Sequence, residues 1–217
     1  PMTALEFAKI TEEVGLPKGV VNVVTGYGDA GAALAGHPDI NQVTFTGSVA
    51  TGISVMKAAA ENVVPVTLEL GGKSPNIVFA DADLDEALEW VVKSIIQNAG
   101  QTCSAGSRLL VESAIHDEFV DRVVKRMEQL KVGPGINHSD IGPIVSKKQL
   151  ERIMNYMEVA KAEGLKILTG GERLTDGELS KGYFFKPTVI DGVTSSNRLA
   201  CEEVFGPVLS VLTFSSV

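Results

Sequence analysis

The sequence predicts an α/β protein that is built around parallel β-sheet. Short β-branched runs alternate with amphipathic helical segments, and this alternation is typical of βαβ units. In addition, 44% of the 217 residues are hydrophobic and 21% are charged, which is ordinary for a protein that buries a core. The double glycine Gly71-Gly72 separates two such lobes, which we place at residues 1–70 and 71–217.

The first lobe is predicted to begin with a helix and a strand. Residues 5–14 carry apolar side chains at helical spacing, and Gly15 and Pro17 end this helix. Residues 20–24 are rich in valine and are interpreted as a strand that is buried on both faces. The remaining elements are a Gly/Ala-rich helix, a strand at 42–45, a helix that begins at Gly47-Ser48, and a strand at 64–70.

The second lobe repeats the alternation. A strand at 74–79 precedes a long helix with an apolar stripe from Leu84 to Ile96, for which Asp81 or Asp83 is the predicted N-cap. Further elements are a strand at 108–111, helices at 119–130 and 150–160, a strand at 166–169, a surface loop at 170–182 and a buried strand at 208–214.

Bulk properties exclude several classes of protein. The net charge is −8 and the basic residues are scattered, so the basic surface that nucleic acid needs is missing. No apolar run approaches the ~18 residues of a membrane span, and the first residues do not resemble a secretory signal. Cys103 and Cys201 are the two cysteines, which predicts reduced thiols in a cytoplasmic protein and no disulfide framework.

Gly26, Gly28 and Gly31 match the pattern G-x-G-x-x-G between a predicted strand and a predicted helix. Glycines in this pattern let a backbone approach a pyrophosphate at a helix N-terminus. No acidic residue ends the next strand, where a partner for ribose is expected. The glycines therefore indicate either a dinucleotide site or simple turn chemistry.

The segment from Phe45 to Gly52 offers a second anion site of the same physical type. Unpaired N–H groups at the start of its helix, together with the Ser48 hydroxyl, could hold a phosphate. Alternatively, Ser48 only caps the helix, as serine commonly does.

Glu69 is a carboxylate among apolar neighbours near the end of a predicted strand. Burial there would raise its pKa toward the range that is useful for a general base. Alternatively, strand alternation points Glu69 to solvent, with Leu68 and Leu70 facing the core.

Cys103 lies in a stretch of small polar residues between a long predicted helix and a strand. That context favours a thiol exposed to a cleft, where a thiolate can react. Cys201 is interpreted as a structural thiol.

A Cys–His hydrolase would need a histidine base, but His37, His116 and His138 lie in polar segments and are interpreted as surface residues. No Cys and His residues fall at metal-ligand spacing, so no metal site is predicted.

Four motifs occur in order along the chain: FTGS at 45–48, LELGGKSP at 68–75, GQTCSAGSR at 100–108 and EEVFGPV at 202–208. Together they resemble segments of the aldehyde dehydrogenases, including that family's glutamate and cysteine signatures. The two signature residues are 103 − 69 = 34 positions apart, which is the family's spacing. The resemblance covers essentially the whole chain.

The resemblance implies an NAD(P)-dependent oxidoreductase that converts an aldehyde to a carboxylic acid. Its fold would be the last part of a Rossmann-like dinucleotide-binding sheet (1–70) followed by most of an α/β catalytic domain (71–217). Cys103 would attack the aldehyde, giving a thiohemiacetal whose oxyanion is held by the Cys103 N–H, and then a thioester. Glu69 would activate the water that hydrolyses the thioester.

The resemblance also implies the residues that contact NAD or NADP. Gly47 and Ser48 would contact the pyrophosphate, Glu203 would bind the ribose on the nicotinamide side, and Phe205 would pack nearby. Gly28 would lie nearer the adenine. The full set of cofactor contacts is Gly28, Gly47, Ser48, Gly52, Leu70, Gly71, Glu203 and Phe205.

The chain also departs from the family pattern. In the family, an asparagine well upstream supplies a second oxyanion donor and an upstream lysine contacts the adenosine ribose, and neither position occurs here. We therefore expect a central segment of a longer enzyme that is inactive, or nearly so, by itself. The alternative is a non-catalytic segment with at most residual nucleotide binding. A CoA-acylating enzyme is disfavoured by Glu69, because water activation needs a carboxylate.

The expected partner is a small aldehyde, with no nucleic acid and no membrane. The resemblance implies a homo-oligomeric enzyme, and exposed strand edges would favour self-association of this segment.

Overall fold

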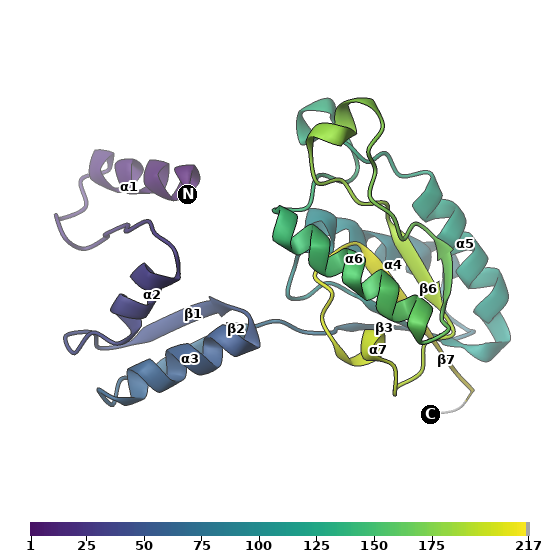
Figure 1. Cartoon of the computed structure of the whole chain (residues 1–217), viewed down its shortest axis with the longest axis horizontal. Helices are drawn as coiled ribbons and strands as arrows, with labels where there is room; N and C mark the ends of the chain where they lie inside the picture. The colour runs from purple at the N-terminus through teal and green to yellow at the C-terminus, as the bar shows by residue number, and fades with distance from the viewer. Residues whose placement is uncertain (216–217) are drawn as a thin grey trace. The chain divides into compact units, whose positions relative to one another are not determined.

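The chain divides into two compact units, Pro1–Leu70 and Gly71–Val217. The computed structural model describes residues 1–215 (Figure 1). The division falls at Gly71, the residue at which the sequence predicts one.

The first unit contains a two-stranded parallel sheet. Pairing runs from Val43 with Val66 to Gly47 with Leu70, so the βαβ unit predicted from the sequence is present. The elements are α1 (Met2–Glu13), α2 (Gly28–Ala35), β1 (Val43–Gly47), α3 (Val49–Ala60) and β2 (Val66–Leu70).

Helix α3 packs on one face of the β1–β2 sheet. Residues alternate between partly buried and exposed along both strands, because successive side chains of a strand point to opposite faces. Gly52 of α3 lies so close to Leu70 that a Cβ atom on Gly52 would fall 2.8 Å from Leu70 Cδ2. The small residue therefore sets how closely this helix approaches the strand.

The prediction of a strand at residues 20–24 is wrong. This segment has no regular secondary structure, and Val20 and Val24 are 63% and 69% exposed. A strand needs a neighbour to receive its backbone hydrogen bonds, and no strand of residues 1–215 pairs with this segment. Valine content indicates a tendency to form strand, but a hydrogen-bonding partner decides whether the strand forms.

The second unit is an α/β domain around a five-stranded sheet in the order β3-β4-β7-β6-β5. Its strands are β3 (Pro75–Val78), β4 (Arg108–Glu112), β5 (Lys166–Thr169), β6 (Thr188–Asp191) and β7 (Val208–Phe214). Its α-helices are α4 (Leu84–Ile96), α5 (His116–Glu128), α6 (Lys147–Ala162) and α7 (Arg198–Cys201). Short 3₁₀ turns occur at η1 (Gln97–Gly100), η2 (Ser113–Ile115), η3 (Gly135–Asn137) and η4 (Gly177–Lys181).

Pairing within this sheet is parallel except at one edge. Strand β5 runs antiparallel to β6, with a register irregularity between Ile167 and Thr169. The sequence predicts β5 in a parallel sheet, and it misses β6 and α7. The sheet is therefore mixed, with its one antiparallel strand at an edge, as is common in large α/β sheets.

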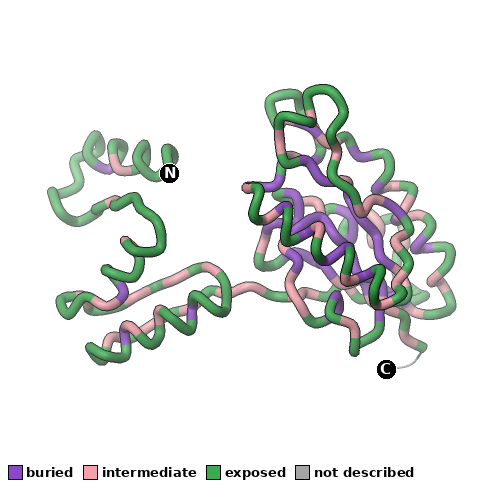
Figure 2. The backbone as a smooth tube through the Cα atoms, viewed as in Figure 1, coloured by how far each residue is buried: buried purple, intermediate pink, exposed green. Residues whose placement is uncertain are grey.

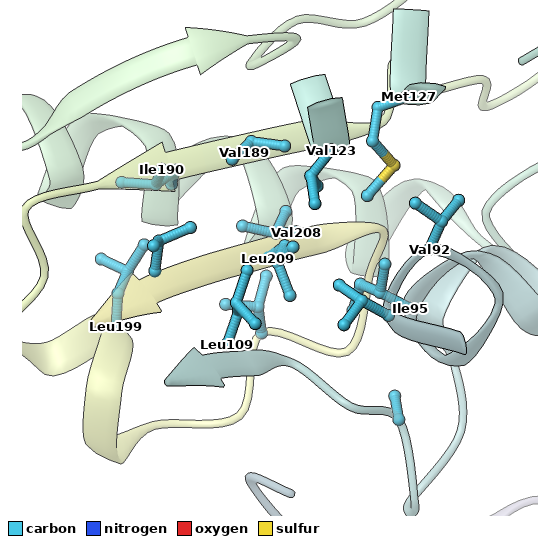
Figure 3. Close-up of a cluster of buried hydrophobic side chains, with 14 of the residues drawn as sticks. Val92, Ile95, Leu109, Val123, Met127, Val189, Ile190, Leu199, Val208 and Leu209 are labelled. Atoms are coloured by element: carbon cyan, nitrogen blue, oxygen red, sulfur yellow. The ribbon is translucent and has the colours of Figure 1, made fainter. Parts of the chain in front are cut away.

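Buried residues are concentrated in the second unit (Figure 2). Val92 and Ile95 of α4, together with Val123 and Met127 of α5, point toward the strand residues of the sheet (Figure 3). The central strand β7 is buried from Val208 to Val211. This core provides the rigid support for the loops that leave the strands.

Candidate active site

The loop that carries Cys103 begins with a run of left-handed backbone. Asn98, Ala99 and Gly100 have φ angles of 51°, 55° and 70°, one residue after the end of α4 and just before the cysteine segment. A left-handed conformation costs an alanine about 1 kcal/mol or more. Only glycine fits at position 100, because a Cβ atom on Gly100 would overlap the backbone of Gly206. Strain of this kind is typical of functional sites.

Reciprocal side-chain hydrogen bonds hold this strained turn. Asn98 Nδ2 donates to the Gln101 carbonyl oxygen over 2.9 Å, and Gln101 Nε2 donates to the Asn98 carbonyl oxygen over 3.0 Å. Gln101 Oε1 accepts the backbone N–H of Val145 over 2.9 Å. The turn is therefore fixed both locally and to a distant loop.

Cys103 is exposed, as its small polar context predicts. Among residues 1–215, its backbone N–H has no acceptor, so it is free to donate to a bound oxygen. The glycine turn at 71–72 lies close by, since a Cβ atom on Gly72 would fall 3.2 Å from the Cys103 carbonyl oxygen.

Glu203 faces the same glycine turn. Its Oε1 accepts the Gly72 backbone N–H over 3.2 Å, and a Cβ atom on Gly71 would overlap its carboxylate. The structure thus brings three sequence-predicted site residues of the second unit together: Cys103, Gly71 and Glu203.

Helix α6 holds the Glu203 segment from the other side. Gln149 Nε2 donates to the carbonyl oxygens of Val204 and Phe205 over 3.0 and 2.9 Å. The Arg152 guanidinium donates to the Glu203 carbonyl oxygen over 2.7 Å. Phe205 has a φ of 60°, so this predicted site residue also lies in strained backbone.

Glu69 lies on the exposed face of β2, whereas Leu68 and Leu70 are partly buried. Strand alternation toward solvent, the second of the two interpretations of Glu69, is therefore the one observed. An exposed carboxylate is available to a polar ligand.

Ser48 is the N-cap of α3. Its Oγ accepts the Thr51 backbone N–H over 3.3 Å, so the capping interpretation is correct. The N–H groups of Val49 and Ala50 have no acceptor in the described part of the chain. Capping and anion binding are therefore compatible at this helix start, because two donors stay free.

A cavity of about 600 Å³ lies within the first unit, between α2, β1 and α3. Gly28 contributes to its wall, as do apolar side chains such as Ile40, Val43 and Val55. An apolar wall with a few hydroxyl groups suits a heteroaromatic ring.

A model of the aldehyde dehydrogenase family matches residues 1–217. The chain belongs to the aldehyde dehydrogenase family. It is 52% identical to betaine aldehyde dehydrogenase of Beta vulgaris over 99% of this chain and 43% of that protein. It is 47% identical to betaine aldehyde dehydrogenase of Bacillus subtilis over 100% of this chain and 44% of that protein.

Solved structures of the family match the fold. Betaine aldehyde dehydrogenase of Staphylococcus aureus in complex with NAD+ superposes with a TM-score of 0.96 at 43% identity, over 99% of this chain and 43% of that one. An aldehyde dehydrogenase of Bacillus cereus in complex with NAD+ gives 0.95 at 49% identity, over 100% and 44%. The chain thus spans less than half the length of these relatives.

Lys73 of the family's glutamate signature is a site residue that the sequence did not single out. Its Nζ is buried and has no hydrogen-bond partner among residues 1–215. Burial, and secondarily the nearby Arg108, lowers the pKa of Lys73 to about 8, although Glu203 acts in the opposite direction. The motif places a lysine here, but only the packed structure reveals that its amine is out of water.

The three histidines were predicted to lie on the surface, and the structure differs from this prediction for one of them. His37 and His138 are exposed, but the His116 side chain is only 18% exposed. Its Nδ1 lies 2.8 Å from Asp117 Oδ1 and its Nε2 lies 3.0 Å from Asp191 Oδ1. The surface prediction for His116 therefore holds only in part, because β6, which supplies Asp191, was missed.

Three further observations concern the remaining predicted features. Cys201 is exposed, and its thiol donates to the Ser195 carbonyl oxygen over 3.3 Å, so it is not a core residue. Within residues 1–215, no three acidic, histidine or cysteine side chains gather as a metal site would require. No helix in that range is both long and apolar enough to cross a bilayer.

Proposed function

We propose that this chain supplies the nucleophile, the general base and cofactor-binding residues for the NAD(P)-dependent oxidation of an aldehyde to a carboxylic acid. The observation that carries this proposal is the Cys103 loop, in which an exposed thiol and a free backbone N–H follow a strained, hydrogen-bonded turn. Family membership supports this chemistry over other reactions of an exposed thiol.

The Cys103 thiolate adds to the carbonyl carbon, which forms a C–S bond and a negatively charged oxygen. The Cys103 N–H donates to this oxygen, and removing one such donor typically lowers a rate by about 10²–10³. Loss of hydride from the same carbon restores the C=O bond and leaves a thioester on Cys103. When bound, NAD+ or NADP+ supplies the hydride acceptor.

Glu69 takes a proton from water, and the water oxygen attacks the thioester carbon. Breaking the C–S bond releases the carboxylic acid and regenerates the Cys103 thiolate. The net reaction consumes one aldehyde, one water and one oxidised nicotinamide.

The residues that would hold the cofactor are those whose surroundings suit a dinucleotide. Gly47 and Ser48, with the free N–H groups of α3, would bind the pyrophosphate. Gly28 would contact the adenine from the wall of the 600 Å³ cavity. Gly52, Leu70 and Gly71 would complete the backbone contacts, and Glu203 and Phe205 would contact the nicotinamide-side ribose.

A direct test mixes the purified chain with an aliphatic aldehyde and NAD+, then NADP+, and follows the absorbance of the reduced nicotinamide. Intact-protein mass spectrometry in the same samples detects an acyl group on Cys103, even where turnover is slow. The acyl adduct is expected in the Cys201→Ala protein and absent from Cys103→Ala. An adduct that survives in Cys103→Ala would contradict the proposal.

A chimera extends this test to full turnover. Residues 1–217 would replace the matching segment of the Bacillus subtilis relative, to which the chain is 47% identical. An active chimera that loses activity in Cys103→Ala and in Glu69→Gln supports the proposed roles. An inactive but folded and NAD-binding chimera favours the alternative of a non-catalytic segment.

The proposal extends to substrate, location and self-association. The substrate is a small aldehyde, and relatives are named for betaine aldehyde and for aminoaldehydes. The proposed location is the cytoplasm, whereas the named relatives include chloroplastic and peroxisomal proteins. Self-association is expected through the free edge of β3, with which no strand of residues 1–215 pairs on its outer side. Sedimentation velocity would measure it.

A further inference from the structure

A recess of about 140 Å³ adjoins the Cys103 loop. Cys103 is exposed and sits between Thr102 and Ser104, both of which line this recess. The recess therefore begins at the residues on either side of Cys103. Its other wall is the last part of α4 and the turn that follows, from which Trp90, Lys93 and Gln97 contribute side chains.

Lys93 is the one charged side chain in the wall of this recess. Nearby carboxylates have other partners: Glu86 accepts the Trp90 indole N–H over 3.3 Å, and Glu89 pairs with Arg126 over 3.2 Å. Within residues 1–215, no acidic side chain forms an ion pair with Lys93. The recess therefore carries an uncompensated positive charge.

One face of the aromatic ring in the wall is already occupied. Lys93 Nζ lies 4.9 Å from the centroid of the Trp90 ring, within the ~6 Å at which an ammonium group and an indole attract. An open aromatic face is what a protein uses to bind amine or quaternary ammonium ligands. Here the ammonium of the chain itself takes that place and repels a second cation.

We propose that Lys93 makes this recess select aldehydes with an anionic tail, such as a carboxylate, over aldehydes with a cationic tail. Gln97 and Ser104 supply hydrogen-bond donors to the same tail. The proposal rests on the proposed function, since it takes Cys103 as the reacting group. This selectivity is the opposite of the preference for cationic substrates that the names of its relatives would suggest.

The test measures how fast Cys103 reacts with two small methanethiosulfonates that differ in charge. One carries a sulfonate and the other a trimethylammonium group, and peptide mass spectrometry reports Cys103 and Cys201 separately. For Cys103, Lys93→Gln should lower the ratio of anionic to cationic rates by about fivefold to tenfold, as a single exposed charge permits. Lys93→Glu should invert the ratio, and Lys93→Arg should keep it.

Two controls separate charge from other effects. Lys161→Gln removes an exposed lysine that pairs with Glu158 on α6, and it should leave the Cys103 ratio unchanged. In Lys93→Gln, the Trp90 ring is free to attract the cationic reagent, which should speed cationic labelling of Cys103. Adding Trp90→Leu should remove that increase. A Cys103 ratio that changes less than twofold in Lys93→Gln, or a Cys103 that neither reagent labels, overturns the inference.

A parallel arm uses aldehydes as protecting agents against iodoacetamide. Glyoxylate should protect Cys103 better than betaine aldehyde does, and Lys93→Glu should reverse this order. If charge governs the labelling ratio but neither aldehyde protects Cys103, the proposed function fails while the charge selectivity of the recess stands. If both aldehydes protect equally in every variant, the selectivity fails while the proposed function stands.

Discussion

Gly72 and Glu203 are joined by a hydrogen bond of 3.2 Å from the glycine N–H to the carboxylate Oε1. This contact couples the glycine turn of the LELGGKSP motif to the EEVFGPV motif, and the Gly72 Cα lies near the Cys103 carbonyl oxygen. Three segments far apart in the sequence therefore meet at two glycines.

Gly71→Ala should displace the Glu203 carboxylate, because the added Cβ would overlap it. The carboxylate is the far end of a flexible side chain and can move aside, so the main cost is loss of the Gly72–Glu203 hydrogen bond, about 1 kcal/mol. The displacement should also weaken NAD+ binding. Urea denaturation and NAD+ titration measure the two effects. Gly135→Ala is the matched control, since a Cβ there meets open space. Equal behaviour of the two variants would show that the contact with Gly71 is unimportant.

Lys73 should make the second unit more stable as pH rises. Its pKa is about 8 in the folded chain against 10.5 for a free lysine, so the unfolded chain binds more protons between these values. The free energy of unfolding should therefore rise from about pH 8 to pH 10.5, by at most about 3 kcal/mol. Lys73→Met should abolish this rise and stabilise the protein near neutral pH. A rise that persists in Lys73→Met would assign it to another group.

His116 should have the opposite pH dependence. Burial acts to lower the pKa of His116, but hydrogen bonds with Asp117 and Asp191 outweigh it and raise the pKa above 6.5. The stabilisation is therefore complete below pH 6.5 and is lost as pH rises through the folded pKa. An NMR titration of the imidazole should show the raised pKa in the native chain and a lower one in Asp191→Asn. An unchanged pKa in Asp191→Asn would exclude the contact with β6 as its cause.

Asp83 should stabilise α4 as its N-cap. Its Oδ1 accepts the N–H groups of Asp85 and Glu86 over 3.0 and 3.1 Å. Asp83→Ala should lower the free energy of unfolding by about 1 kcal/mol, as measured by thermal or urea denaturation. Asp81→Ala removes the neighbouring carboxylate that does not cap the helix and should have little effect. A larger loss for Asp81→Ala would reverse the assignment.

Local patterns predicted the elements whose signals are contained in a few residues. The apolar stripe and cap of α4, the helices α5 and α6, and the strands β3, β4 and β7 are all present where the periodicity indicates them. The sequence also limited the N-cap of α4 to Asp81 or Asp83. The hydrogen bonds that Asp83 accepts from the backbone decide between them.

Elements that depend on distant partners were not predictable in the same way. The valine-rich run at 20–24 has strand composition but no strand beside it. Strand β6 is short, and only its place between β5 and β7 makes it a strand. The direction of β5 follows from the same placement, which no single segment of sequence contains.

The candidate site likewise combines features that local sequence predicts with features that depend on distant contacts. Small polar residues around Cys103 correctly predicted an exposed thiol. The buried amine of Lys73 and the support of Phe205 by Gln149 depend on tertiary contacts between segments remote in sequence. Periodicity carries no information on such contacts.

The order of strands in the second unit has a consequence for synthesis on the ribosome. Strand β7 is translated after the other four described strands, yet it pairs with β4 on one side and β6 on the other. Until Val208–Phe214 leaves the exit tunnel, the β3–β4 and β5–β6 pairs cannot join. During that interval, at about 5–20 residues per second, two apolar strand edges stay open to other chains. A ribosome that stalls before Val208 therefore releases a product prone to aggregation, and the nascent chain becomes a natural client for chaperones that bind exposed strands.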